Sequence, residues 1–198
     1  RAAADVHEGV SWTFLTLAIP LALDGQWVTL AWAGQGVALL WLATRSPAPV
    51  AAWGGLAALL LAAVRAVALD RYWFPGSTPV GNTTFLVHLL VVLALVLGGG
   101  LAGRVLGARL GRLSPEALRA TLWVAAVATL AVLLWREPSG LWPAILLTGE
   151  LLVVGWLARV SASPAFVVAI PLLAAVLLVR VLGADENLAR QAAESLVN

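Results

Sequence analysis

The sequence predicts an all-α fold, a polytopic bundle of about seven transmembrane helices, and three observations support this class. Of the 198 residues, 62% are hydrophobic and only 11% are charged, and the mean hydropathy is +0.96. A soluble domain of this length does not bury so much apolar surface. The apolar residues fall into runs close to the roughly 20 residues that span a bilayer, and a block of the chain recurs 115 residues later. Because lipid offers no hydrogen-bond partner to open backbone, these runs should be helices.

Turn signals divide the amino-terminal half of the chain into four apolar segments. Pro20 lies inside the first segment and should kink it or end it early. The turns around Gly25 and Pro47 are short, so the helices they join should pack as antiparallel neighbours. The stretch 70–83 is the only long outer connection. The four predicted spans are 10–23, 27–44, 50–69 and 83–103.

Three further segments follow in the carboxy-terminal half. Ser114 and Pro115 provide a cap and a first-turn proline for the fifth helix, and turns rich in Pro and Ser separate the fifth, sixth and seventh segments. The three predicted spans are 117–135, 141–158 and 165–182. The tail 183–198 is expected to be a loop that leads to a further helix, with a mildly amphipathic stretch at 186–197.

An internal duplication organises these segments. The matched positions include rare residue types in one frame, and a fixed period of this kind indicates repeated structure. The offset relates the first three helices to the last three, so the repeat unit is four helices. An even number keeps both copies in one orientation, unlike an inverted repeat. We therefore expect a first repeat at 1–115 and an incomplete second repeat at 116–198. The matched pairs include Gly25/Gly140, Trp27/Trp142, Trp41/Trp156, Pro49/Pro164, Arg65/Arg180 and Asp70/Asp185.

The charges differ between the two predicted membrane faces. The amino-terminal end and the loops after the second, fourth and sixth helices hold seven Arg and three acidic residues, a balance of +4. The other face holds five Arg and six acidic residues, a balance of −1. The positive-inside rule places the first face in the cytoplasm. The loop 104–119 is then the main cytoplasmic anchor, either as a topology determinant alone or also in contact with anionic lipid headgroups.

Composition also excludes several classes of site. All 12 basic residues are Arg, and the chain has no Cys and no Met, which rules out disulfides, thiol catalysis and cysteine metal sites. With His7 and His88 as its only histidines, the chain predicts no metal site and no cofactor. The pI is near 10.4, but a net charge of +2 with Arg at helix ends fits membrane topology and argues against nucleic-acid binding. A Ser-His-Asp set and paired carboxylates at catalytic spacing are also missing.

Glu150 is the clearest polar candidate, because a charge near the bilayer centre costs roughly 2.5 to 3.5 kcal/mol. It lies nine residues after Leu141, about 13 Å along a helix, and its repeat equivalent is Gln35. One hypothesis is a site for a proton, a cation or a polar substrate group. The alternative is a carboxyl group that joins helices, with close contacts at Gly34 and Gly149.

A second group of candidates lies toward the outer face. Arg65 and Arg180 occupy equivalent places five residues before Asp70 and Asp185. They either extend to the lipid headgroups or hold an anion. His88 lies at a depth similar to that of Arg65 and is either structural or a ligand or proton relay. In the outer loop, the run Tyr72 to Phe74 fits an interfacial aromatic belt, and a sugar-stacking platform is the alternative.

Two stretches carry a family resemblance. The run Leu17 to Ala33, with Gly36 and Leu40-Trp41-Leu42, resembles the signature of a large family of bacterial multi-spanning membrane proteins. So does Val64-Arg65 leading through Asp70 to Pro79-Val80-Gly81-Asn82 and Phe85. The family is catalogued only as domain of unknown function two-three-three-nine. Its members are much longer, so the resemblance implies that this chain is an internal portion of a protein in the bacterial inner membrane. It implies no reaction, and the family often has Glu where this chain has Gln35.

Three classes of function follow. A non-enzymatic envelope protein that binds or moves a small polar or lipid-linked substrate would use Glu150, Gln35, Arg65, His88 and Asp70, and predicts a water-accessible cavity. A scaffold or accessory subunit predicts that these groups pair with each other, with partners on its apolar faces. A membrane-embedded transferase needs a carboxylate in an aqueous loop, and only Asp70 qualifies. The expected partners are the lipid bilayer and the rest of a longer chain or other membrane subunits.

Overall fold

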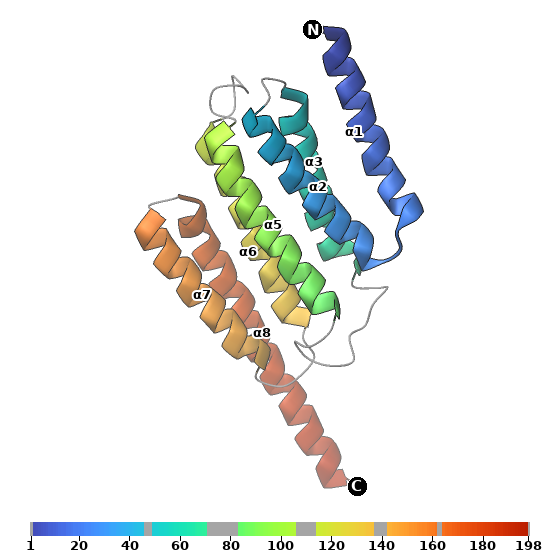
Figure 1. Ribbon diagram of the computed structural model, residues 1–198. Coiled ribbons are helices and arrows are strands. Elements are labelled where there is room, and N and C mark those ends of the chain that lie inside the picture. Colours follow the sequence, from blue (N-terminus) through green and yellow to red (C-terminus); the bar gives the residue numbers. More distant parts are fainter. Residues whose placement is uncertain are drawn as a thin grey trace. The chain divides into compact units, whose positions relative to one another are not determined.

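In the computed structural model, the chain is helical over nearly all of the described residues, which are 2–45, 49–70, 83–105, 114–136, 142–161 and 164–197. This confirms the all-α class. The helices are α1 (Ala2–Ala22), α2 (Gln26–Arg45), α3 (Pro49–Ala68), α5 (Thr83–Val105), α6 (Pro115–Arg136), α7 (Trp142–Ser161) and α8 (Pro164–Val197) (Figure 1).

Several of these helices have the dimensions of membrane spans. Within the described residues, five are long and apolar enough to cross a bilayer, and α1 contributes a shorter apolar stretch, Gly9–Ala22. The helix α7 carries Glu150 and Arg159 in its 20 residues and is not among the five. The chain is therefore a polytopic membrane protein. The five spans are Gln26–Arg45, Pro49–Ala68, Thr83–Arg104, Pro115–Trp135 and Phe166–Gly183.

The helix boundaries follow local signals in the sequence. Proline is the first residue of α3, α6 and α8, where its missing N–H costs nothing. Ser114 caps α6, because its Oγ accepts a hydrogen bond of 2.9 Å from the backbone N–H of Ala117. The helix α1 ends at Ala22, two residues after Pro20, as that proline predicts.

Two boundaries differ from the sequence prediction. The helix α1 begins at Ala2 and not near residue 10. The helix α8 continues through the predicted outer loop to Val197. After Gly183 this tail consists largely of Ala, Glu, Leu, Arg and Gln, which are strong helix formers, and it contains no proline. Apolar runs locate the membrane-crossing segments, but they do not show whether a helix continues into the polar sequence beside them.

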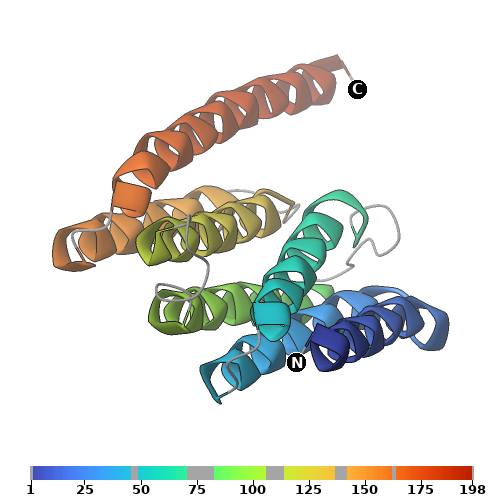
Figure 2. The same cartoon turned by 90° about the horizontal axis from the view of Figure 1, so that it is seen from above.

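The chain divides into two compact units, Arg1–Leu130 and Ala131–Asn198. In the first unit α2 packs most extensively on α3 and α5, and these helices lie side by side in both views (Figures 1 and 2). Their shared core is built from Leu and Ala side chains, and α6 contributes Leu122 and Ala126 to it. The antiparallel neighbours expected from the short turn after α2 are therefore present.

Glycines bring α2, α3 and α5 close together. A Cβ atom built on Gly36 lies 2.9 Å from the carbonyl oxygen of Gly55, and one built on Gly55 lies 2.9 Å from that of Gly36. A Cβ on Gly98 of α5 would overlap the side chain of Leu59. Such contacts were predicted at Gly34 and Gly149 instead, but a Cβ atom on either glycine meets no atom of the described residues within 4 Å. The prediction is wrong at both positions, and for Gly34 the reason is that it and Gly36, two positions apart on a helix, face different directions.

In the second unit α7 packs on α8. The buried side chains there include Leu147, Val154, Phe166 and Leu173. Both α2 with α3 and α7 with α8 are pairs of contacting helices that are consecutive in the chain, as the repeat requires, and the duplication itself stays a prediction. Trp27, Trp41 and Trp156 are each about half exposed, at 52%, 47% and 62%, and tryptophan is enriched at membrane–water interfaces.

Candidate functional site

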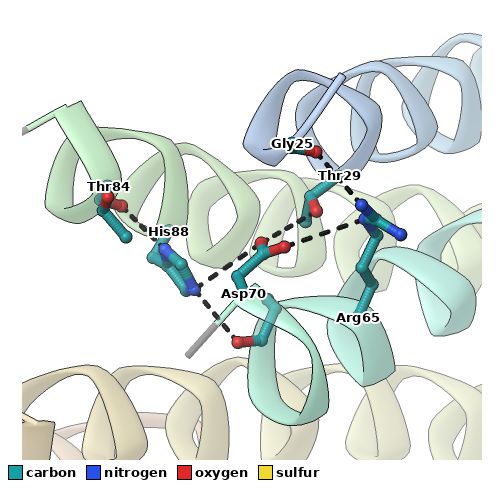
Figure 3. Close-up of polar contacts among 7 residues, drawn as sticks. Gly25, Thr29, Arg65, Asp70, Thr84 and His88 are labelled. Atoms are coloured by element: carbon teal, nitrogen blue, oxygen red, sulfur yellow. Dashed lines mark hydrogen bonds and ion pairs between the residues drawn. The ribbon is translucent and has the colours of Figure 1, made fainter. Parts of the chain in front are cut away.

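Asp70 is the centre of the candidate site. It lies just beyond the end of α3, and only 1% of its surface is exposed. Its Oδ2 accepts a hydrogen bond of 2.8 Å from the hydroxyl of Thr29, which lies about one turn into α2 and is fully buried (Figure 3). A charged group in such surroundings needs paired charges or hydrogen bonds, and two further side chains approach it.

Arg65 is the first of these side chains. Its Nε lies 3.7 Å from Oδ1 of Asp70, and its Nη2 donates a hydrogen bond of 3.2 Å to the carbonyl oxygen of Gly25. The guanidinium also lies 5.9 Å from the ring centre of Trp32, within the range of a cation–π contact. Gly25 has φ of 57°, a left-handed conformation that glycine adopts at little cost. The turn before α2 thereby presents a backbone acceptor to Arg65.

His88 approaches Asp70 from α5. Its Nε2 lies 3.9 Å from Oδ2 of Asp70 and 3.0 Å from the carbonyl oxygen of Ala66, while its Nδ1 lies 2.7 Å from the carbonyl oxygen of Thr84. Carbonyl oxygens only accept hydrogen bonds. Both contacts are therefore hydrogen bonds only when each ring nitrogen carries a proton, so the geometry matches an imidazolium with Asp70 as its counter-ion.

We refer to Thr29, Arg65, Asp70 and His88 together as the Asp70 cluster. It joins α2, the end of α3, and α5 at one end of these helices (Figure 3). The exposed fraction is 20% for the Arg65 side chain and 3% for that of His88. Among the described residues Oδ1 of Asp70 has no hydrogen bond, so it depends on the charge of Arg65. The polar side-chain atoms of the cluster thus contact mainly other polar atoms of the same cluster.

The structure brings together three residues that the sequence singled out, which are Arg65, Asp70 and His88. One expectation is corrected, because Asp70 is buried and does not belong to an aqueous loop. Arg65 contacts the Asp70 carboxylate and the carbonyl oxygen of Gly25. The outer aromatic residues Tyr72 to Phe74 lie outside the described residues.

Thr29 is the member that sequence reasoning missed. A threonine in an apolar helix carries no distinctive signal, because its hydroxyl is commonly satisfied by a carbonyl of the preceding turn. Thr13, Thr16, Thr121, Thr129 and Thr148 all bond in that way. The position of Thr29 along its helix could have indicated the contact, because Thr29 and Asp70 both lie within about one turn of the same end of adjacent helices.

Gln35 belongs to a different contact. Its Nε2 donates a hydrogen bond of 2.8 Å to the hydroxyl of Thr16, and Nε1 of Trp32 donates one of 3.0 Å to the carbonyl oxygen of Thr16. These bonds attach α1 to α2. Gln35 therefore joins helices in the first unit and is not part of the Asp70 cluster.

Glu150 and Arg180 lie in the second unit. Glu150 on α7 is 7% exposed, and neither of its carboxylate oxygens has a hydrogen-bond partner among the described residues. Arg180 on α8 lies 5.4 Å from the ring centre of Trp135. Of the six candidate residues, then, three form one cluster and the other three occupy separate places. The described parts of the chain contain no group of three or more His, Asp or Glu arranged to hold a metal.

Comparison with known proteins adds no identification. No family model, curated protein or solved structure matches the chain. The function is therefore inferred from the geometry of the chain itself.

Proposed function

We propose that the chain is a non-enzymatic structural or accessory part of a larger membrane protein assembly, and that the Asp70 cluster fastens its first helical unit. One observation carries this proposal. Thr29, Asp70 and His88 are buried, and together with Arg65 they contact each other at one end of α2, α3 and α5. Such pairing is what the scaffold hypothesis predicts for them.

The same geometry argues against the other two classes at this position. A site that binds a polar substrate presents unpaired donors and acceptors to an accessible cavity, whereas Thr29, Asp70 and His88 are all at most 2% exposed. A transferase needs a carboxylate that its substrate can reach, and the burial of Asp70 removes the one candidate. Exposed leucines and valines along α8, such as Leu172 and Leu178, offer surface to lipid or to other membrane helices.

The cellular setting forms part of the proposal. The proposed membrane is the bacterial inner membrane. The excess of Arg at one end of the helices supports an orientation with the amino-terminal end of this chain in the cytoplasm. The resemblance to the domain of unknown function two-three-three-nine family supports the same setting and a longer parent protein. In that arrangement the Asp70 cluster faces the outer leaflet.

Solvent access at Thr29 tests the proposed role. The chain has no Cys, so a single Thr29→Cys substitution is the only reactive thiol. A hydrophilic maleimide should leave this thiol unmodified in the folded protein and modify it after denaturation. Asp24→Cys is the matched control, because Asp24 is exposed a few residues earlier in the chain. Equal labelling rates at the two positions in the folded protein would show a water-filled site and contradict a fastening role.

Glu150 supports a second candidate function, the binding of a proton or a polar substrate group. The supporting observation is that both carboxylate oxygens are buried without a donor among the described residues. Infrared spectroscopy tests it, with Glu150→Gln used to assign the carboxyl band. Rapid exchange of that band in deuterated water would support a hydrated binding site. Slow exchange would leave Glu150 as a group that joins helices, in line with the first proposal.

A further inference from the structure

A groove lies between α3 and α6 in the first unit, away from the Asp70 cluster. It has a volume of about 210 Å³ and is lined by Trp53, Leu56, Ala57, Leu60, Leu118, Thr121 and Leu122. Leu56 and Leu122 form a buried floor, with 6% and 2% of their surfaces exposed, whereas Trp53 and Leu60 are about half exposed at its sides. The groove is therefore apolar and partly open to the surface.

The length of the groove along the helices matches the thickness of one leaflet of a bilayer. Leu60 is eleven residues after Pro49, the first residue of α3, which is about 16 Å along a helix. Half of the roughly 30 Å hydrocarbon core is about 15 Å. On α6 the lining residues fall within the first two or three turns after Pro115. The groove thus runs from the starting ends of both helices to about the middle of the membrane.

The mouth of this groove is basic. Arg45 is the last residue of α2, Arg104 lies in the last turn of α5, and Arg119 follows the groove residue Leu118 on α6. Because successive helices run in opposite directions, these ends lie at the same side of the membrane. Within the described residues, neither Arg104 nor Arg119 forms a salt bridge, and Nε of Arg119 has no acceptor. Glu116 is the acidic group in the first turn of α6.

Arg119 is held beside the groove by α5. Its aliphatic stem packs at Gly103, where a built Cβ lies 3.2 Å from Cδ of Arg119. Its guanidinium lies 5.3 Å from the ring centre of Trp123, and Trp123 Nε1 donates a hydrogen bond of 3.2 Å to the carbonyl oxygen of Val96. This packing keeps a cation, which has no carboxylate partner in the part of the chain that the structure describes, at the headgroup level of the leaflet that the groove occupies.

We propose that this groove binds one acyl chain of an anionic phospholipid, with its phosphate group held by Arg119 and Arg104. The apolar lining matches the acyl chain, the length matches one leaflet, and the guanidinium groups, which form no salt bridge within the described residues, match the phosphate. This site is independent of the function proposed for the Asp70 cluster.

The experiment compares lipid binding by the purified, delipidated 198-residue chain in a mild detergent. Phosphatidylglycerol is the anionic probe, phosphatidylcholine the zwitterionic comparison, and glycerol 3-phosphate the soluble headgroup without acyl chains. Apparent dissociation constants come from native mass spectrometry and from the lipid-dependent shift in unfolding temperature. Two variants address the two parts of the site: Arg119→Gln removes the charge, and Ala57→Trp fills the groove.

Each variant has a matched control. Arg159→Gln removes an exposed Arg in the second unit, and Ala38→Trp adds the same bulk at an exposed position of α2 outside the groove. We expect Arg119→Gln to weaken phosphatidylglycerol binding about fivefold, the scale for losing one basic residue near anionic lipid. Ala57→Trp should weaken the binding of both phospholipids, and both controls should bind like the parent chain.

Three results would overturn the proposal. Equal affinity for the two phospholipids in the parent chain would exclude selection by the arginines. A stabilising shift with glycerol 3-phosphate as large as that with phosphatidylglycerol would indicate a site for a free anion and not for a lipid. Unchanged phosphatidylglycerol binding in Ala57→Trp would exclude the groove. Because each readout is a difference caused by added lipid, a general loss of stability in a variant does not imitate any of them.

Discussion

Asp70 is surrounded by groups that supply either a proton or a positive charge. Thr29 donates a hydrogen bond to it, and the guanidinium group of Arg65 and the imidazole ring of His88 lie within 4 Å. Removing a carboxylate from water is expensive, and the cost is offset only when its partners are well placed. If Asp70 lost its negative charge, positive charge on these partners would remain in the protein interior without compensation. The stability of this end of the unit should therefore depend on that one carboxylate.

The first prediction concerns Asp70→Asn. This substitution keeps the shape of the side chain and removes its charge, so it should lower the free energy of unfolding by about 3 kcal/mol, the scale for breaking a buried ion pair. Unfolding in mixed detergent micelles, followed by circular dichroism, measures the change. Asp24→Asn makes the same substitution at an exposed position and should change the free energy of unfolding by less than about 0.5 kcal/mol. Equal effects of the two substitutions would contradict the assignment.

The second prediction concerns the hydroxyl of Thr29. Thr29→Val keeps the volume but removes the donor to Oδ2 of Asp70. A hydrogen bond to a charged group is worth roughly 1.5 to 3 kcal/mol, so we expect a loss of about 2 kcal/mol in the same assay. Thr29→Ser retains the hydroxyl and should recover most of that loss. If Val and Ser were equally destabilising, packing of the γ-methyl group and not the hydrogen bond would explain the effect.

The third prediction concerns the protonation of His88. Because both ring nitrogens face carbonyl oxygens, both should carry protons in the folded protein. Nitrogen chemical shifts of ¹⁵N-labelled histidine distinguish an imidazolium from either neutral tautomer, and His88→Leu assigns the signal against that of His7. A neutral tautomer in the folded parent chain would show that one of the two carbonyl contacts is not a hydrogen bond.

At the scale of helices, packing in the first unit depends on a few glycines that let backbones approach. In lipid there is little hydrophobic force between helices, so close van der Waals packing takes on much of that role. Gly36 and Gly55 face each other between α2 and α3, and a Cβ atom on either would lie within 3 Å of the opposite helix. Gly34 is only two residues away and meets nothing within 4 Å.

These two environments give the fourth prediction. Gly55→Ala forces a methyl group against the backbone of α2 and should cost about 1 to 3 kcal/mol, the range for overpacking a core. Gly34→Ala adds the same atom to open space and should be neutral or slightly stabilising, because Ala favours helix over Gly by about 1 kcal/mol. Thermal unfolding of the two variants makes the comparison. A smaller loss for Gly55→Ala than for Gly34→Ala would contradict the packing of α2 on α3.

The helices could be predicted from the sequence almost to their ends. Apolar runs bounded by Pro, Gly and Ser predicted each helix of the described residues, because a bilayer allows few alternatives to a helix. The beginning of α1 and the continuation of α8 to Val197 could not be found this way, since polar sequence carries no signal of membrane depth. The glycine contacts were placed at Gly34 and Gly149 in error, because a repeated residue marks similarity between the copies and not which face is packed.

The candidate site could be predicted in part. Arg65, Asp70 and His88 stand out because charged residues in or beside apolar segments are rare and costly, and the helix directions place them at one depth. Depth does not determine rotation about the helix axis, so their mutual pairing and the role of Thr29 required the structure. For the same reason Gln35 and Glu150, related by the sequence offset, turned out to have different surroundings, one bonded to α1 and the other without a partner among the described residues.

For the whole molecule, the charge asymmetry leads to the fifth prediction. Ser114 lies at the Arg-rich end of the helices and Asp24 at the opposite end. In intact bacterial cells a membrane-impermeant maleimide should modify Asp24→Cys and leave Ser114→Cys unmodified, whereas both should react after the cells are opened. Because the parent chain has no Cys, it provides the unlabelled control. Labelling of Ser114→Cys alone in intact cells would reverse the proposed orientation.

The proposed role of the Asp70 cluster requires that Asp70 and His88 act as one structural unit across α3 and α5. A double-mutant cycle with Asp70→Asn, His88→Leu and the combined variant measures this directly, as the coupling in the free energy of unfolding. We predict that the double variant loses less than the sum of the two single losses, by about 1 kcal/mol or more. Additive losses, within about 0.5 kcal/mol, would mean that the two side chains do not stabilise each other and would contradict the Asp70 cluster as the fastening of the first helical unit.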